Sequence, residues 1–204
     1  MENKKIIIVA HILEIGSERL EVAGFRHQSL SSEDTQLYVC DNTVVVVVGI
    51  GAEKATRSLR TLLRDGWLDQ PAHILLTGSA GSYTIPVLDI VQCNTPHPSI
   101  PMDFPTAHLE CVHEFVSPSS PHPELHVPFT AFDMESEAIA TFLKNEAPDA
   151  ANTFTIVKVI SDDGSGSLGD WASVCRTHVQ PRVMDVVLSF INRTTSETEK
   201  TKTL

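Results

Sequence analysis

The chain has 204 residues, of which 42% are hydrophobic and 20% charged, as in an ordinary globular protein. A formal net charge of -11, without a run of Lys and Arg, argues against a nucleic-acid partner and against an anionic membrane surface. The four cysteines are scattered, and no apolar stretch has the length of a signal peptide or a membrane span. We therefore expect a cytoplasmic protein with one domain at 1–193 and a polar, disordered tail at 194–204.

Two apolar, β-branched runs in the N-terminal part predict buried strands. The first covers 6–10 and has the composition of a central parallel strand, and the second is the valine run at 44–48. Residues 37–40 are joined to the valine run by an Asp-Asn turn, so we expect a hairpin there. A helix is expected at 52–64, because its leucines fall on one face.

A short strand at 73–76 is followed by the glycine-rich segment TGSAG at 77–81, which we expect to form a loop. Glycines let the backbone approach a ligand, and the N–H groups and two hydroxyls could hold an anion or a sugar hydroxyl. An ordinary tight turn explains the same residues. The segment matches neither the P-loop nor the dinucleotide-binding fingerprint, so neither a nucleoside triphosphate nor a dinucleotide is indicated.

The remaining elements follow from composition and periodicity. We expect strands at 87–93, 111–116 and 153–160, Pro-rich loops at 94–105 and 117–128, a helix at 134–145, and a last helix at 171–191 with a possible kink at Pro181. Strands that alternate with helices indicate an α/β fold with a mixed, mostly parallel sheet. The carboxyl ends of its strands are then the expected place for an active site.

Each acidic residue that could carry chemistry has an ordinary explanation as well. Asp133 suits a helix N-cap and Glu135 the first turn of that helix, Asp162 can cap a turn, and Glu14 resembles a solvated surface residue. The combination is more informative than any one of them. Glu14 and Asp162 both follow predicted strands, where the side chains of different strands can meet at one edge of a sheet.

Five segments of the chain, taken in order, resemble the motifs of one protein family: VGIGAEKA at 48–55, TGSAG at 77–81, DIV at 89–91, FDMESEAIA at 132–140 and VISD at 159–162. They resemble the nucleoside phosphorylase superfamily, and most closely its hydrolytic branch, the methylthioadenosine/S-adenosylhomocysteine nucleosidases. The resemblance covers residues 5–193, and its most specific part is the Asp-Met-Glu motif followed by Ile-Ser-Asp. It implies a three-layer α/β/α fold with a mixed, barrel-like central sheet, and a homodimer or higher homo-oligomer.

The resemblance also implies an activity, the hydrolysis of the N-glycosidic bond of a purine nucleoside. A 5′-thio-substituted adenine nucleoside is the family's own example, and neither a metal nor an organic cofactor is implied. Asp162 would protonate or hydrogen-bond the purine, Glu135 would bind the ribose hydroxyls, and Glu14 would activate water. Further substrate contacts are implied for Met134, Ser79, Gly78, Ser161 and Phe115, with Phe104 as a second candidate for the aromatic that stacks on the base.

Two other functions fit the same residues. A phosphate-dependent purine nucleoside phosphorylase needs cations around the phosphate, and Arg26, Arg57 and Arg60 could supply them. Glu14 favours hydrolysis, because a carboxylate would repel phosphate. A non-catalytic nucleoside-binding protein of the same fold is favoured by the lack of a clear base-stacking aromatic and disfavoured by the intact acidic residues.

Overall fold

The centre of the molecule is formed by the two apolar runs. The computed structural model describes residues 4–31, 35–116, 122, 125–165 and 168–202. β1 (Lys4–Val9) and β4 (Thr43–Val47) pair in parallel, and β1 pairs on its other side with β5 (Ala72–Gly81), also in parallel. Successive side chains of β1 and β4 enter two different apolar cores. Both faces of these strands are therefore covered, which explains why their sequences are apolar throughout.

The expected hairpin is present at one edge of the sheet. β3 (Gln36–Cys40) runs antiparallel to β4, and the turn between them contains Asp41 in a left-handed conformation with φ of 50°. Asp tolerates this conformation better than most residues do, as the turn prediction requires. The short strand β2 (Arg26–Gln28) pairs with β3 and forms the edge.

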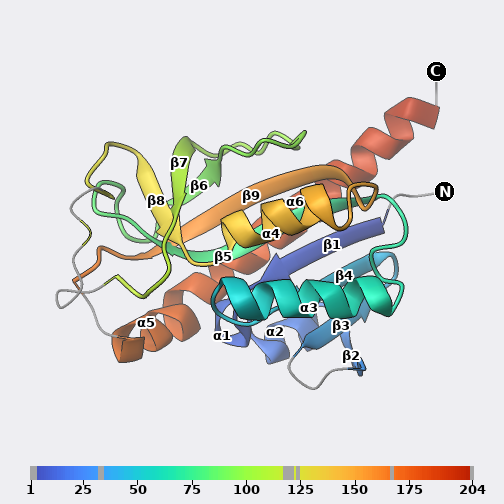
Figure 1. Cartoon of the computed structure of the whole chain (residues 1–204), viewed down its shortest axis with the longest axis horizontal. Coiled ribbons are helices and arrows are strands. Elements are labelled where there is room, and N and C mark those ends of the chain that lie inside the picture. The colour runs from blue at the N-terminus through green and yellow to red at the C-terminus, as the bar shows by residue number, and fades with distance from the viewer. Residues whose placement is uncertain (1–3, 32–34, 117–121, 123–124, 166–167, 203–204) are drawn as a thin grey trace.

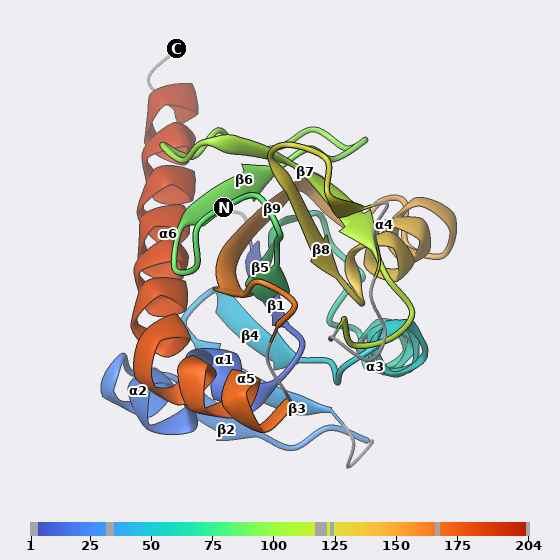
Figure 2. The same ribbon diagram turned by 90° about the vertical axis from the view of Figure 1, so that its left-hand side faces the viewer.

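At the other end the sheet curls on itself. β8 (Thr130–Asp133), β7 (Thr106–Cys111), β6 (Ile90–Cys93) and β9 (Ala151–Asp162) extend it beyond β5. β9 then returns to pair with β5 in parallel along nearly its whole length, and this pairing closes a barrel (Figure 2). The prediction of a mixed, barrel-like sheet is confirmed.

Helices cover both faces of the sheet, as the predicted three-layer fold requires (Figure 1). α3 (Ala52–Arg64) and α4 (Ser136–Asn145) lie on one face and bury their leucine and phenylalanine side chains in a shared core. The opposite face is covered by α1 (Ile12–Ile15), α2 (Ser17–Val22), α5 (Leu168–Val174), the π-helical turn η2 (Cys175–Val179) and α6 (Gln180–Lys202).

The glycine-rich segment is part of a strand, and the prediction of a loop there is wrong. β5 continues to Gly81, and its glycines leave room for side chains that pack against the strand. A Cβ at Gly78 would lie 2.7 Å from Glu14 Oε2, and one at Gly81 would lie 2.1 Å from Phe132 Cε2. These glycines are needed for close packing against a strand rather than for a turn.

Two other strands differ in their bounds from the sequence-based expectation. β7 ends at Cys111, so the expected strand at 111–116 is wrong; Val112 and Val116 instead pack over Phe132. β6 begins at Ile90, because Leu88 adopts a φ of 75° that interrupts the extended backbone. Most of the second Pro-rich segment, 117–128, lies outside the described residues.

The C-terminal helical region begins at Leu168 and changes its winding before Pro181. The π-helical turn η2 lies directly before α6, close to the position where a kink is expected. Proline lacks the N–H that would continue the α-helical pattern, which accounts for an irregularity at this point. Helical backbone continues in α6 past Thr194, and the disorder expected for the tail stays a prediction.

Candidate active site

A cavity of about 350 Å³ lies at the carboxyl ends of β1, β4, β5, β8 and β9, where the sequence places its candidate residues. All but one of the predicted site residues line it: Glu14, Ser79, Phe115, Met134, Glu135, Ser161 and Asp162. The exception, Gly78, lies beneath Glu14. Phe104 packs instead against the apolar core beneath α6 and does not line the cavity. Phe115 lines it and is therefore the better placed of the two aromatic candidates.

Glu14 is a buried carboxylate that is held by four donors. Its Oε2 accepts hydrogen bonds from the backbone N–H groups of Ala10 and His11, both at 3.0 Å. Its Oε1 accepts from Ser79 N at 2.8 Å and from Ser79 Oγ at 2.6 Å. The short helix α1 turns the Glu14 side chain back toward the end of β1. The position of this carboxylate therefore depends on the backbone of residues 10–11 and on Ser79 of β5.

Ser79 links Glu14 to the aromatic side chain of Trp171. Its hydroxyl donates to Glu14 and accepts a hydrogen bond from Trp171 Nε1 at 3.0 Å. Trp171 comes from α5, lines the cavity and meets His11 edge to face at 5.9 Å between ring centroids. The N-terminal and C-terminal parts of the chain are thereby joined at the wall of the cavity.

Glu135 lies at the start of α4 and is only 4% exposed. Its Oε1 accepts a hydrogen bond of 2.6 Å from the backbone N–H of Gly51, at the start of α3. Burial raises the pKa of Glu135 from 4.5 to about 7; repulsion from Asp133 and Glu14 acts in the same direction, and attraction to Lys158 opposes it. This carboxyl group therefore changes its charge near neutral pH.

A fully buried ion pair lies beneath Glu135. Lys158 Nζ, from β9, is 2.8 Å from Asp133 Oδ2, and each side chain is 1% exposed. Burial by itself lowers the pKa of the Lys158 ammonium, but the charges of Asp133, Glu135 and Glu14 outweigh it and raise that pKa above its ordinary value. Asp133 Oδ1 also accepts from Ser136 N and Oγ, which partly agrees with the helix-capping role expected for it.

Asp162 ends β9 and is less buried than the other two carboxylates. Its Oδ2 accepts from Ser161 Oγ at 2.7 Å, and its Oδ1 accepts from Gly164 N at 3.0 Å. Gly164 has a positive φ of 75° and packs against the ring of Tyr83, so the turn after β9 is tightly specified. Asp162 is thus fixed at the mouth of the barrel, opposite Gly81 of β5.

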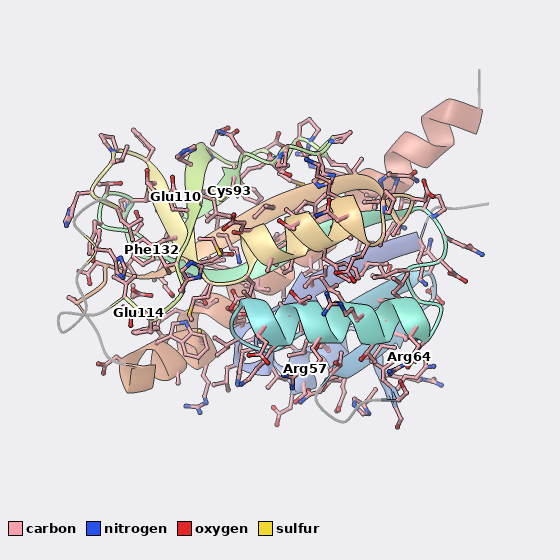
Figure 3. All side chains as sticks on the ribbon, in the orientation of Figure 1. Arg57, Arg64, Cys93, Glu110, Glu114 and Phe132 are labelled. Carbon is pink, nitrogen blue, oxygen red and sulfur yellow. The ribbon has the colours of Figure 1, made fainter. Side chains whose placement is uncertain are left out.

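The wall formed by residues 112–116 and β8 is largely apolar. Phe115, Val112 and Val116 line the cavity beside Phe132, and Glu114 lies at its rim. In Figure 3, Glu114 and Phe132 lie at the same end of the molecule, far from Arg64 at the other end of α3. An apolar wall opposite several carboxylates suits a flat, amphiphilic ligand.

Sequence reasoning missed three residues of the site. Lys158 is a charged residue in an otherwise apolar strand, which was an available signal, but its partner could not be named before the barrel closure was known. Trp171 reaches the cavity through the packing of α5, and Lys54 lines it from α3. The described residues contain no group of three or more His, Cys, Asp or Glu side chains arranged to hold a metal ion.

Solved structures share this architecture. A methylthioadenosine/S-adenosylhomocysteine nucleosidase from Colwellia psychrerythraea, in complex with adenine, matches with a TM-score of 0.70 over 95% of this chain and 96% of that chain, at 18% identity. The corresponding nucleosidase of Streptococcus pneumoniae, with 8-aminoadenine, matches at 0.69 over 92% and 98%, at 17% identity. Futalosine hydrolase from Helicobacter pylori matches at 0.68 over 97% and 99%, at 16% identity.

The chain has the nucleoside phosphorylase-like fold. The fold predicted from the sequence resemblance is therefore confirmed. No family model and no curated protein matches the sequence. None of the helices in the described parts of the chain combines the length and the apolar composition that crossing a bilayer requires.

Proposed function

We propose that this chain is a nucleosidase that hydrolyses the N-glycosidic bond of a purine nucleoside and releases the free base. The observation that carries the proposal is the convergence of Glu14, Glu135 and Asp162, from three distant parts of the sequence, on one cavity. The cavity has a volume of about 350 Å³, which is in the range of small-molecule sites. Proteins of the same fold that are named as nucleosidases or as futalosine hydrolase support the same reaction type.

Asp162 is assigned to the purine. The base leaves as an anion unless it gains a proton or a strong hydrogen bond, so an acidic group beside it lowers the barrier. The bonds from Ser161 Oγ and Gly164 N occupy one acceptor position on each oxygen and fix the direction of the carboxyl group. Phe115, in the apolar wall, is assigned to stacking on the base.

Glu135 and Met134 are assigned to the ribose. An ionised Glu135 accepts hydrogen bonds from the two ribose hydroxyls and also favours the positive charge that develops on the sugar in the transition state. The buried Lys158–Asp133 pair beneath it compensates one negative charge and leaves that of Glu135 for the substrate. Met134, partly buried next to it, provides an apolar surface under the sugar.

Glu14 is assigned to the water that attacks the sugar. All four acceptor positions of its carboxylate are occupied by donors, so an attacking water must replace one of them. The Ser79 hydroxyl is the donor that can give way, because it rotates, whereas the three backbone N–H groups are fixed. Trp171 Nε1 continues to hold the Ser79 oxygen while the hydroxyl hydrogen turns away.

Phosphorolysis has less support at this site. Among the described residues that line the cavity, Lys54 is the one Lys or Arg, and Glu14 occupies the inner wall. Arg57 and Arg60 are paired with Glu53 and Glu146 on the surface of α3. A phosphate ion would therefore meet several carboxylates and a single cation.

The direct test is release of free base from a panel of purine nucleosides and their 5′-methylthio derivatives, with and without added phosphate. We expect release in phosphate-free buffer. A strict requirement for phosphate would establish a phosphorylase instead. Binding without release by the wild-type chain would indicate a non-catalytic nucleoside-binding protein.

The resemblance to the family also leads us to propose a homodimer or higher homo-oligomer, and the scattered cysteines lead us to propose that it is cytoplasmic. Light scattering coupled to size-exclusion chromatography measures the mass directly. A mass that corresponds to a single chain of 22.3 kDa at micromolar concentration would contradict this part of the proposal.

A further inference from the structure

Lys54 differs from the other cations of its helix. Arg57 is paired with Glu53, Arg60 with Glu146, and Arg64 contacts Asp65 and Ser31; these three are on the outer surface of α3. Lys54 lines the cavity instead. In the described parts of the chain, no hydrogen bond or ion pair joins Lys54 to another residue.

The placement of Lys54 is not explained by the helix itself. It is the third residue of α3, and a cation in the first turn is disfavoured by the helix dipole. Its side chain packs over the loop that follows β4: a Cβ at Gly49 would lie 2.9 Å from Lys54 Cβ and 3.2 Å from Lys54 Cδ. Gly49, with φ of 91°, therefore provides the space in which the Lys54 stem lies beside the cavity-lining Ile50.

Lys54 lies at the sugar end of the cavity rather than at the base end. The N-cap residue of α3, Gly51, contacts Glu135 through its N–H at 2.6 Å, and Lys54 lies in the first turn of the helix, less than one turn after Gly51. Asp162, by contrast, is held at the end of β9 by Ser161 and Gly164. A charge recognised by Lys54 therefore belongs to a substituent of the sugar.

We propose that the site prefers purine nucleosides whose 5′ substituent carries a negative charge, with Lys54 as the residue that determines this preference. The inference rests on the proposed hydrolysis. If Glu135 binds the 2′ and 3′ hydroxyls and the base occupies the 1′ carbon, the 5′ carbon is the position from which a substituent can reach Lys54. The Lys54 ammonium group has no partner in the described parts of the chain and is a suitable point charge for a carboxylate or a phosphate.

The surroundings make the effect of this single cation measurable. The protein has a net charge of -11, and the cavity is lined by several carboxylates, so an anionic ligand is otherwise repelled. Because Lys54 is exposed, water and salt weaken its attraction. We therefore expect a change of about tenfold in relative kcat/KM rather than complete dependence, which corresponds to one well-formed charged hydrogen bond.

The experiment compares 5′-deoxyadenosines that differ in charge at the 5′ position: methylthio (neutral), carboxymethylthio (anionic) and 2-aminoethylthio (cationic), with adenosine 5′-phosphate as a second anion. The full chain is compared with Lys54→Met and Lys54→Glu. Lys144→Met, an exposed lysine on α4 outside the cavity, is the matched control. The readout is the ratio of kcat/KM for the anionic and cationic compounds at low and high salt.

We expect the wild type and Lys144→Met to prefer one or both anions over the cation by about tenfold, with a smaller ratio at high salt. Lys54→Met should lower the ratio about tenfold, and Lys54→Glu should invert it. An unchanged ratio in Lys54→Met, or no preference for either anion in the wild type, would overturn the inference while hydrolysis still stands. If no nucleoside is cleaved, the hydrolysis proposal fails, and calorimetric Kd ratios for the same ligands then decide whether Lys54 selects anions.

Discussion

Two groups of carboxylates in this chain are held in different surroundings. The surface group, Glu53 and Glu146, pairs with arginines of α3 and is open to solvent, with side-chain exposures of 86% and 38%. The cavity group is Glu14, Glu135 and Asp162, and its members accept hydrogen bonds from backbone N–H groups and hydroxyls. Among the described residues, none of these three carboxylates is directly paired with an arginine or a lysine.

The comparison shows that the buried carboxylates of the cavity reduce the stability of the fold, whereas the surface pairs have little effect on it. Solvated ion pairs cost little to form and contribute little, because water and salt screen them. Buried carboxylates lose hydration, and Glu135 shows this in its raised pKa. Perturbed ionisable groups of this kind concentrate at functional sites, whereas a surface pair requires no such explanation. Substitutions in the two groups should therefore have very different consequences.

The largest effect is expected for Asp162→Asn. Loss of the acidic group should lower kcat by about 10²–10⁴-fold, because the leaving purine no longer receives a proton. The fold should be retained, since the amide oxygen of Asn can still accept from Gly164 N and its NH2 group can donate to Ser161 Oγ. Asp163→Asn is the matched control, because Asp163 is the exposed neighbour and is absent from the cavity lining. Equal activity of the two variants in a base-release assay would refute the role of Asp162.

The second effect concerns the buried pair under Glu135. Lys158→Met should lower the free energy of unfolding by about 3–5 kcal/mol, because Asp133 is left as an uncompensated buried charge. Denaturant unfolding measures the change, and Lys144→Met on the surface of α4 is the control. The double variant Lys158→Met with Asp133→Asn should recover part of the loss. A decrease of less than 1 kcal/mol in the single variant would mean that the pair is not essential.

The contrast between these residues also shows what the sequence could predict. The apolar runs at 6–10 and 44–48 predicted the central strands correctly, because strands buried on both faces have few alternatives. The family motifs identified Glu135 and Asp162, the resemblance selected Glu14 by its offset after the first strand, and the structure places all three around one cavity. Their chemical roles remain proposals.

Long-range packing accounts for what was missed. Nothing local in the sequence indicates that Lys158 meets Asp133, because the contact depends on the closure of the barrel between β5 and β9. The TGSAG segment has turn-like composition, yet its glycines serve the approach of Glu14 and Phe132 to a strand. Residues whose neighbours come from distant segments cannot be assigned from local composition alone.

The third prediction uses the titration of Glu135. Its pKa is about 7 in the folded chain and 4.5 without burial, so between these values the folded chain holds a proton that the unfolded chain has released. The stabilising contribution is therefore complete below pH 4.5 and is lost as the pH rises through 7. The difference amounts to about 3 kcal/mol, since one pKa unit corresponds to about 1.4 kcal/mol.

Unfolding free energies measured from pH 4.5 to 8 for the wild type and Glu135→Gln provide the test. The stability of the wild type relative to the variant should fall across this range, because Gln does not titrate. Glu137→Gln, an exposed residue in the first turn of α4, is the control and should follow the wild type. Parallel plots of unfolding free energy against pH for the wild type and Glu135→Gln would show that the pKa of Glu135 is not raised in the folded chain.

The smallest effect is expected in the surface group. Arg60 makes two contacts with Glu146, Nε to Oε2 at 2.9 Å and Nη2 to Oε1 at 2.7 Å, so its geometry is as favourable as that of the buried Lys158–Asp133 pair, whose single contact is 2.8 Å. Arg60→Met should nevertheless leave the denaturation midpoint and kcat/KM within experimental error, because both side chains are solvated. High salt should change the denaturation midpoints of the variant and of the wild type by the same amount. A midpoint shift comparable to that of Lys158→Met would show that geometry, rather than burial, decides the importance of a charge in this fold.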